Sequence, residues 1–213
     1  KKVIDYAADS NYTHVELAFG NDGLRFLLDD MSLTVNGTAY DSNKVTSAIQ
    51  KGNRAFYDAG TNELTESEMT DIISYAEGKG IGIIPMFDAT GHLEAVVKAM
   101  ETLGMSPVYT KPTTSGTSVN YAIDTTDNAS TSFVKALMQK YITYFKKQGC
   151  TMFNFAADEC GFSEMTNTAY TSYAKFINEL AAMVKSTNMT PMAFNDGIYH
   201  LNLKTSTDFD TSI

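Results

Sequence analysis

Met152-Phe153-Asn154-Phe155-Ala156-Ala157-Asp158-Glu159-Cys160-Gly161 is a short apolar run that stops at two adjacent carboxylates. The two phenylalanines suit a buried strand, whereas ionised carboxylates avoid a core unless they are paired or serve a functional surface. A buried strand that ends in acidic side chains is typical of an α/β barrel, which carries its chemistry at the C-terminal ends of its strands. The alternative is that Asp158 and Glu159 begin the next helix, where acidic side chains interact favourably with the helix dipole.

The pattern of a strand followed by a helix recurs along the chain. Strand-like runs are found at 13–19, 81–88, 152–157 and 191–197, helical periodicity at 1–10, 44–57, 65–78, 93–103, 131–147 and 167–185, and a polar loop at 105–128. Such alternation predicts βα units around a parallel sheet. We therefore predict an α/β fold, a (β/α)8 TIM barrel that is only partly present. We expect residues 1–213 to be a fragment of a single catalytic barrel domain, with a long decorated loop at about 20–60.

Several local signals place the ends of these elements. Asn36-Gly37 predicts a tight hairpin turn, and Ser42 is a candidate cap for the helix after it. Thr65 and Glu68 have the spacing of a capping box, in which each side chain serves the other's backbone. Pro85 lacks an N–H group and predicts that ladder pairing of its strand ends about there.

Composition excludes several classes of protein. The chain has 213 residues, 43% of them hydrophobic, and a net charge of −9. Its 16 basic residues form no cluster, so we expect no nucleic-acid partner. No apolar run approaches the ~20 residues of a membrane span. Cys150 and Cys160 flank a strand-like run and would be roughly 30 Å apart, so we expect no disulfide between them.

Polar side chains follow each predicted strand. Because the C-terminal ends of parallel strands meet at one rim, side chains far apart in sequence are expected to converge there. The candidates are Asn21, Asp22 and Arg25; Asp88 and His92; Asn154, Asp158 and Glu159; and Asn195 and Asp196.

Two kinds of chemistry fit this set. Glycoside hydrolysis needs a protonated carboxylic acid beside an ionised carboxylate. A divalent metal site could instead be formed by carboxylates and an imidazole, here Asp88, Asp158, Glu159, Asp196 and His92. Adjacent acids on a regular strand point to opposite faces, so Asp158 and Glu159 suit two separate roles better than one metal.

The motifs resemble glycoside hydrolase family 20, the β-N-acetylhexosaminidases. In that family one strand ends in Ile-Pro…Asp…Pro-Gly-His and a later strand ends in Asp-Glu. This chain has Ile84-Pro85-Met86-Phe87-Asp88-Ala89-Thr90-Gly91-His92 and then Phe153-Asn154-Phe155-Ala156-Ala157-Asp158-Glu159. The runs Gly20-Asn21-Asp22-Gly23-Leu24-Arg25-Phe26 and Met192-Ala193-Phe194-Asn195-Asp196-Gly197 are similar to the bacterial cell-wall-anchored exo-β-N-acetylglucosaminidases. The resemblance covers about helix 1 to strand 6 of the barrel.

The resemblance implies retaining, substrate-assisted hydrolysis of a terminal β-linked N-acetylhexosamine (GlcNAc) on a glycan. Glu159 would be the acid/base, and Asp158 would hold the acetamido group as an oxazolinium ion forms. His92 and Asp88 would support them, and Asn195, Asp196, Asp22 and Asn154 would contact the sugar. The resemblance implies no metal and no cofactor. It also implies an extracellular or cell-wall-anchored bacterial location.

Some residues depart from the family pattern. Thr90 replaces the family's proline, Asn21 replaces an aspartate, and the chain has no tryptophan. The alternatives are release of a disaccharide, as by lacto-N-biosidases, a catalytically silent glycan-binding barrel, and a metal-dependent barrel enzyme. Because half a barrel exposes strand edges and an open core, we expect these 213 residues alone to be inactive and poorly stable.

Overall fold

The computed structural model describes residues 1–56, 63–107, 109–110, 122–160, 166–195, 197–198 and 209–213. In chain order the elements are α1 (Lys2–Asp9), β1 (His14–Asn21), β2 (Gly23–Leu24), β3 (Leu33–Val35), β4 (Thr38–Tyr40), α2 (Ser42–Phe56), α3 (Glu66–Glu77), β5 (Gly82–Phe87), α4 (Glu94–Thr102), β6 (Tyr109–Thr110), β7 (Ala122–Ile123), α5 (Asn128–Lys147), β8 (Met152–Asn154), α6 (Asn167–Lys185) and β9 (Thr190–Met192).

A five-stranded sheet of order β2-β1-β5-β8-β9 organises the molecule. The strands β1, β5, β8 and β9 are parallel neighbours and follow one another along the chain, with helices between them. This arrangement confirms the predicted α/β fold with its parallel sheet. Only β2 is antiparallel; it forms a short hairpin with the end of β1.

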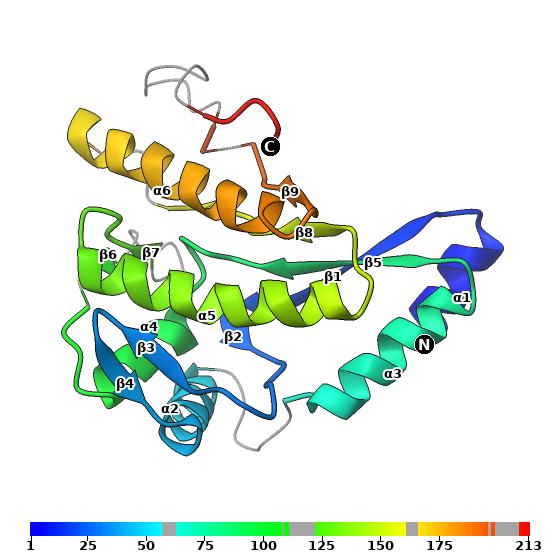
Figure 1. Cartoon of the computed structure of the whole chain (residues 1–213), viewed down its shortest axis with the longest axis horizontal. Coiled ribbons are helices and arrows are strands. Elements are labelled where there is room, and N and C mark those ends of the chain that lie inside the picture. The colour runs from blue at the N-terminus through cyan, green and yellow to red at the C-terminus, as the bar shows by residue number, and fades with distance from the viewer. Residues whose placement is uncertain (57–62, 108, 111–121, 161–165, 196, 199–208) are drawn as a thin grey trace.

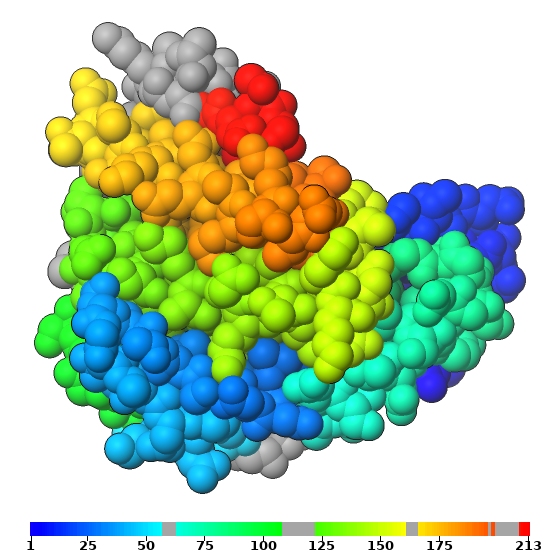
Figure 2. Space-filling model, in the orientation of Figure 1, coloured from blue at the N-terminus to red at the C-terminus, as the bar shows by residue number. Residues whose placement is uncertain are grey.

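Helices cover one face of the sheet. Figure 1 shows α5 and α6 side by side along the strands, and in Figure 2 they supply much of the visible surface on this side. Beneath α5 lies an aromatic cluster whose members are all buried: Phe19, Phe26, Phe87, Tyr141, Phe145 and Phe153. On the other face of the sheet, His14, Glu16 and Ala18 of β1 are exposed. The sheet is therefore packed on one side only within the part of the chain that the structure describes.

The stretch 20–60 contains ordered elements as well as loop. The Asn36-Gly37 turn joins β3 to β4 with φ angles of 49° and 81°, which confirms the predicted hairpin. The cap predicted at Ser42 is wrong. Asp41 accepts the Lys44 N–H at 2.9 Å, and the Ser42 hydroxyl instead accepts the N–H of Met31.

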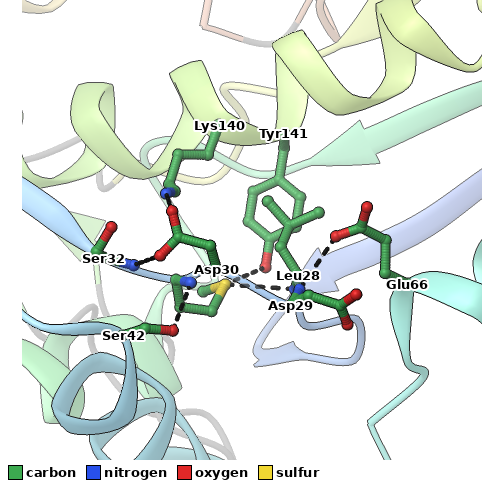
Figure 3. Close-up of polar contacts among 9 residues, drawn as sticks. Leu28, Asp29, Asp30, Ser32, Ser42, Glu66, Lys140 and Tyr141 are labelled. Atoms are coloured by element: carbon green, nitrogen blue, oxygen red, sulfur yellow. Dashed lines mark hydrogen bonds and ion pairs between the residues drawn. The ribbon is translucent and has the colours of Figure 1, made fainter.

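The segment before β3 is hydrogen-bonded to helices α3 and α5 (Figure 3). Asp30 pairs with Lys140 of α5 at 2.9 Å, the Asp29 N–H donates to Glu66 of α3, and the Tyr141 hydroxyl donates to the Phe26 carbonyl at 2.7 Å. These bonds fix the chain that leaves β2 against α5 and α3.

Pro85 does not end strand pairing, contrary to the prediction. It lies in register with Leu17, and pairing continues to Phe87. The amides of Gly82 and Asp88 both donate to the β1 side. Because successive amides of a strand alternate in direction, the odd-numbered Pro85 directs its nitrogen away from β1. On that side β8 pairs with β5 only at Met86, so little hydrogen bonding is lost.

Other local predictions were confirmed. Thr65 and Glu68 form the capping box of α3. Helix α6 spans residues 167–185 as predicted, and Thr166 caps it. Cys150 and Cys160 are both buried and free.

Helix α5 begins earlier than predicted, because Asp127 caps it by accepting the N–H groups of Ala129 and Ser130. The predicted loop at 105–128 contains the short β6–β7 pair; residues 108 and 111–121 lie outside the described residues. Among the described helices, none is both long and apolar enough to span a membrane.

Candidate active site

The C-terminal ends of the parallel strands converge through backbone hydrogen bonds. The Asp88 N–H donates to the carbonyl of Gly20 at 2.6 Å, and the Ala89 N–H donates to Phe155 at 3.1 Å. At the next strand end, the Phe194 N–H donates to Ala156 at 2.8 Å. The loops after β1, β5, β8 and β9 are therefore joined into one rim, as the parallel topology predicts.

The backbone of this rim is strained. Eight described non-glycine residues have positive φ angles, and five of them lie here: Asp22 (61°), His92 (48°), Ala156 (51°), Ala157 (65°) and Glu159 (42°). Each such conformation costs on the order of 1–3 kcal/mol and persists only where its surroundings enforce it. The turn after β8 also lets Asp158 and Glu159 leave the alternation of a strand, so that both reach the rim.

Asp22, His92 and Glu159 form a hydrogen-bonded chain. His92 Nδ1 lies 2.6 Å from Asp22 Oδ1, and its Nε2 lies 3.0 Å from Glu159 Oε2. The hydrogen bond to Asp22 raises the pKa of His92 to about 9, although partial burial opposes this. The same bond lowers the pKa of Asp22. At neutral pH the imidazole ring is therefore protonated on both nitrogens, with Nδ1–H directed at Asp22 and Nε2–H directed at Glu159.

Asp88 and Asp158 form a second pair beside this chain. Asp88 is wholly buried at the end of β5, and a carboxylate oxygen of each residue lies within 4.8 Å of a His92 ring nitrogen and of the other's oxygen. Burial raises the pKa of Asp88 well above its usual range, and the neighbouring negative charge of Asp158 raises it further.

Gly91 and Thr90 allow the two loops to meet. A Cβ atom on Gly91 would lie 2.5 Å from the backbone oxygen of Asp158, so no side chain fits there. Thr90 is buried, and its N–H donates to Asp88 Oδ1 at 3.1 Å. The proline of the family pattern has no N–H and would lack this bond. The departure at Thr90 thus adds a donor to the Asp88 carboxyl.

The structure places some predicted residues differently. Asp22, predicted to contact the sugar, instead bonds His92 Nδ1 with its carboxylate, which is also stabilised by the charge of Arg25. Substrate contact by Asn154 is not supported, because it is 2% exposed and its amide bonds Glu16 at 2.7 Å and the Ala156 N–H at 2.8 Å.

The remaining candidates lie toward the end of β9. Asn195 is exposed just beyond the strand. Asp196 lies outside the described residues. Asn21 is the last residue of β1.

The sequence did not reveal two glutamates that contact residues of the rim. Glu94 is buried at the start of α4 and hydrogen bonds Asp22. Glu16 of β1 receives the Asn154 amide across the sheet. No local pattern marks Glu16, whereas Glu94 follows His92 by two residues and an acid in a first helical turn is an ordinary dipole partner.

Comparison with known proteins identifies relatives of this arrangement. The model of the glycosyl hydrolase family 20 catalytic domain matches residues 2–209. Two structures of the pneumococcal exo-β-D-N-acetylglucosaminidase StrH are similar at 37% and 38% identity, with TM-scores of 0.88 and 0.87. Each match covers 99% of this chain and 53% of the other, so this chain spans about half the length of those relatives.

A more distant structure supports the fold alone. Dispersin B is 21% identical with a TM-score of 0.65, over 99% of this chain and 56% of that one. Together the matches show that the sheet and its helices are part of a (β/α)8 barrel. Because the family model matches residues 2–209, nearly the whole chain, this chain belongs to glycosyl hydrolase family 20 and carries part of its catalytic domain.

Proposed function

We propose that the protein containing this chain hydrolyses terminal β-linked N-acetylglucosamine from glycans. The observation that carries the proposal is the arrangement of Asp158 and Glu159 at the rim, with His92 in contact with Glu159. Family membership and the similarity to StrH support it. StrH is described as an exo-β-D-N-acetylglucosaminidase and as acting in N-glycan recognition and hydrolysis.

The first step of the proposed reaction breaks the glycosidic bond. The carbonyl oxygen of the substrate's 2-acetamido group attacks the anomeric carbon, and the bond to the leaving oxygen breaks. Glu159 gives that oxygen a proton, so the aglycone leaves as a neutral alcohol. Asp158 accepts a hydrogen bond from the acetamido N–H and stabilises the positive charge of the oxazolinium ion.

The second step opens this intermediate with water. Glu159, now ionised, takes a proton from a water molecule while the oxygen of that water bonds to the anomeric carbon. The acetamido carbonyl is released, and the sugar retains its configuration. The proton taken from the water returns Glu159 to its starting state, and the 3.0 Å contact between His92 Nε2 and Glu159 Oε2 orients the acid/base carboxyl throughout.

Glu159→Gln in the complete protein tests the proposal. The amide cannot donate a proton as an acid, so kcat for a chromogenic N-acetylglucosaminide should fall by about 100- to 10,000-fold. Binding of a GlcNAc-terminated oligosaccharide should persist in calorimetry. The matched control is Glu179→Gln on the outer helix α6, where Glu179 pairs with Lys135, and its kcat should be unchanged. Unaltered turnover in Glu159→Gln would contradict the assignment, and binding without any wild-type turnover would favour a silent glycan-binding barrel.

We also propose an extracellular bacterial location for the protein. The support is the similarity to StrH, which is described as a pneumococcal virulence factor. Accessibility of an epitope tag to antibody on intact cells of the source organism would test this location; labelling only after cell lysis would contradict it.

A further inference from the structure

Two buried carboxylate oxygens at the rim have no hydrogen-bond donor among the described residues. They are Oδ2 of Asp88 and Oδ1 of Asp158. The other oxygen of Asp88 is satisfied by the Thr90 N–H at 3.1 Å. A buried acceptor without a donor costs about 1–3 kcal/mol, and more when it is charged. Two such atoms side by side therefore require an explanation.

A single proton between them would resolve both deficits. A carboxylate oxygen of Asp88 lies within 4.8 Å of one of Asp158, and the interaction between the two side chains raises the pKa of Asp88. Two ionised carboxylates this close in a buried site would repel strongly, so one of them retains a proton. A protonated carboxyl is a donor as well as an acceptor, and it satisfies its partner.

The surroundings decide which residue keeps the proton. Asp88 is 0% exposed, whereas Asp158 is half-buried and its charge interacts favourably with the His92 imidazolium. Burial disfavours the charged form most where water is fully excluded. The other ionisable groups around the pair are Glu159 and Asp22, which His92 bridges; Asp22 also interacts with Glu94 and Arg25.

We propose that Asp88 is a protonated positioning residue, which donates its carboxyl hydrogen to Asp158 and so fixes the orientation of that carboxylate for the substrate's acetamido group. This inference rests on the proposed function for its catalytic meaning, but the protonation itself does not. One oxygen of Asp158 would be held by Asp88, and the other would stay available for the acetamido N–H. The Thr90 amide would hold the second oxygen of Asp88 and fix its rotamer.

A bound cation is a less suitable occupant than a proton. Asp88, His92 and Asp158 have the proximity of a metal site. However, both ring nitrogens of His92 are already bonded, at 2.6 Å to Asp22 and at 3.0 Å to Glu159. An imidazolium with two N–H donors offers no lone pair to a metal. Only two carboxylate oxygens would remain, fewer than the divalent ions found in such oxygen sites require.

Paired substitutions in the complete protein separate these possibilities. Asp88→Asn keeps an acceptor for the Thr90 N–H and places an N–H donor toward Asp158, so it mimics the protonated acid. Asp88→Leu has a similar volume and no donor. We expect kcat to stay within about tenfold of wild type in Asp88→Asn, and to fall by about 100-fold in Asp88→Leu, because Asp158 loses its orientation. Tyr141→Phe, which removes a buried hydroxyl donor from the core, is the matched control and should lower the Tm without changing kcat.

A spectroscopic readout tests the protonation without reference to activity. The infrared difference spectrum of wild type minus Asp88→Asn at neutral pH should contain the C=O band of one protonated carboxylic acid, because only the wild type carries the proton on Asp88. This result would stand even if the protein proved not to be a hydrolase, whereas failure of the proposed function would appear as an inert Glu159→Gln substitution.

Three results would overturn the inference. The first is a loss in Asp88→Asn as large as that in Asp88→Leu, since this would mean that a charged carboxylate is required. The second is absence of a carboxylic-acid band from the wild-type minus Asp88→Asn difference spectrum. The third is loss of activity in a chelator with recovery on adding a divalent metal, which would assign the orphan oxygens to a cation. If Asp88→Leu fails to fold, Asp88→Asn and the infrared band still decide.

Discussion

Phe87 and Asp88 are consecutive residues at the end of β5, and both are buried, yet they belong to two different regions. Phe87 points into the aromatic cluster, where its ring lies 5.8 Å from that of Phe19 and stacks at 6.1 Å on that of Tyr141. Asp88 points to the opposite side, toward Asp158. The strand's alternation thus places its last apolar residue in the core and its next residue in the site.

Burial has opposite effects on stability in the aromatic cluster and at the rim. Burial of aromatic rings in the core is favourable and needs no partner beyond close packing. Burial of carboxyls at the rim is unfavourable, and this region also holds five residues in left-handed backbone conformations. Two equally buried residues can therefore change the stability of the fold in opposite directions. The core supplies the stability that allows the rim to keep a strained, charged arrangement.

Truncation of a core ring should give the largest effect on stability. Phe145 is fully buried and lies 5.2 Å from Phe19. Phe145→Ala should lower the free energy of unfolding by about 3–5 kcal/mol, because it leaves a cavity beneath α5. Chemical denaturation of the complete protein measures this loss. Activity per folded molecule should be unchanged. A large fall in kcat of the folded fraction would contradict the claim that the core contributes to stability and not to the chemistry of the rim.

The charged chain at the rim should give a smaller, pH-dependent effect. The folded-state pKa of His92 is about 9, above its unfolded value near 6.5. The folded state therefore binds more protons between these values, and its stabilisation is complete below about pH 6.5 and is lost as pH rises through about 9. The loss should be on the order of 1–3 kcal/mol.

Comparison of two histidine variants isolates that effect. In His92→Gln the decline in unfolding free energy over this pH range should be reduced. His14→Gln removes an exposed histidine at the other end of β1 and should leave the decline intact. Equal declines in wild type and His92→Gln would show that the Asp22–His92 interaction does not stabilise the fold.

Elements with strong local signals could be predicted from the sequence. The capping box at Thr65 and Glu68 and the full extent of α6 follow from chemistry within a few residues, and both were predicted correctly. Alternation of strands and helices was enough to predict the parallel sheet. The Pro85 prediction failed because it considered the missing N–H without the direction of that amide, which only the neighbouring strands define.

The site was predictable only in part. The motif spacing placed Asp88, His92, Asp158 and Glu159 at one rim, and the structure brings them together. The pairing of His92 with Asp22 joins residues 70 positions apart, and that of Asn154 with Glu16 joins residues 138 apart. No local pattern encodes such long-range partners. The orphan oxygens of Asp88 and Asp158 could be recognised only from three-dimensional burial.

The central claim is that the substrate's acetamido group is the nucleophile, that Asp158 orients this group, and that Glu159 is the acid/base. The most direct test is a series of aryl N-acetylglucosaminides whose acetamido group carries zero to three fluorine atoms, measured with the complete protein. Fluorine withdraws electrons from the amide oxygen and weakens it as a nucleophile. We predict that log kcat/KM falls steeply and monotonically with each fluorine, while Glu179→Gln behaves as wild type. A rate independent of fluorine content would contradict the account, because the nucleophile would then come from the protein or from water.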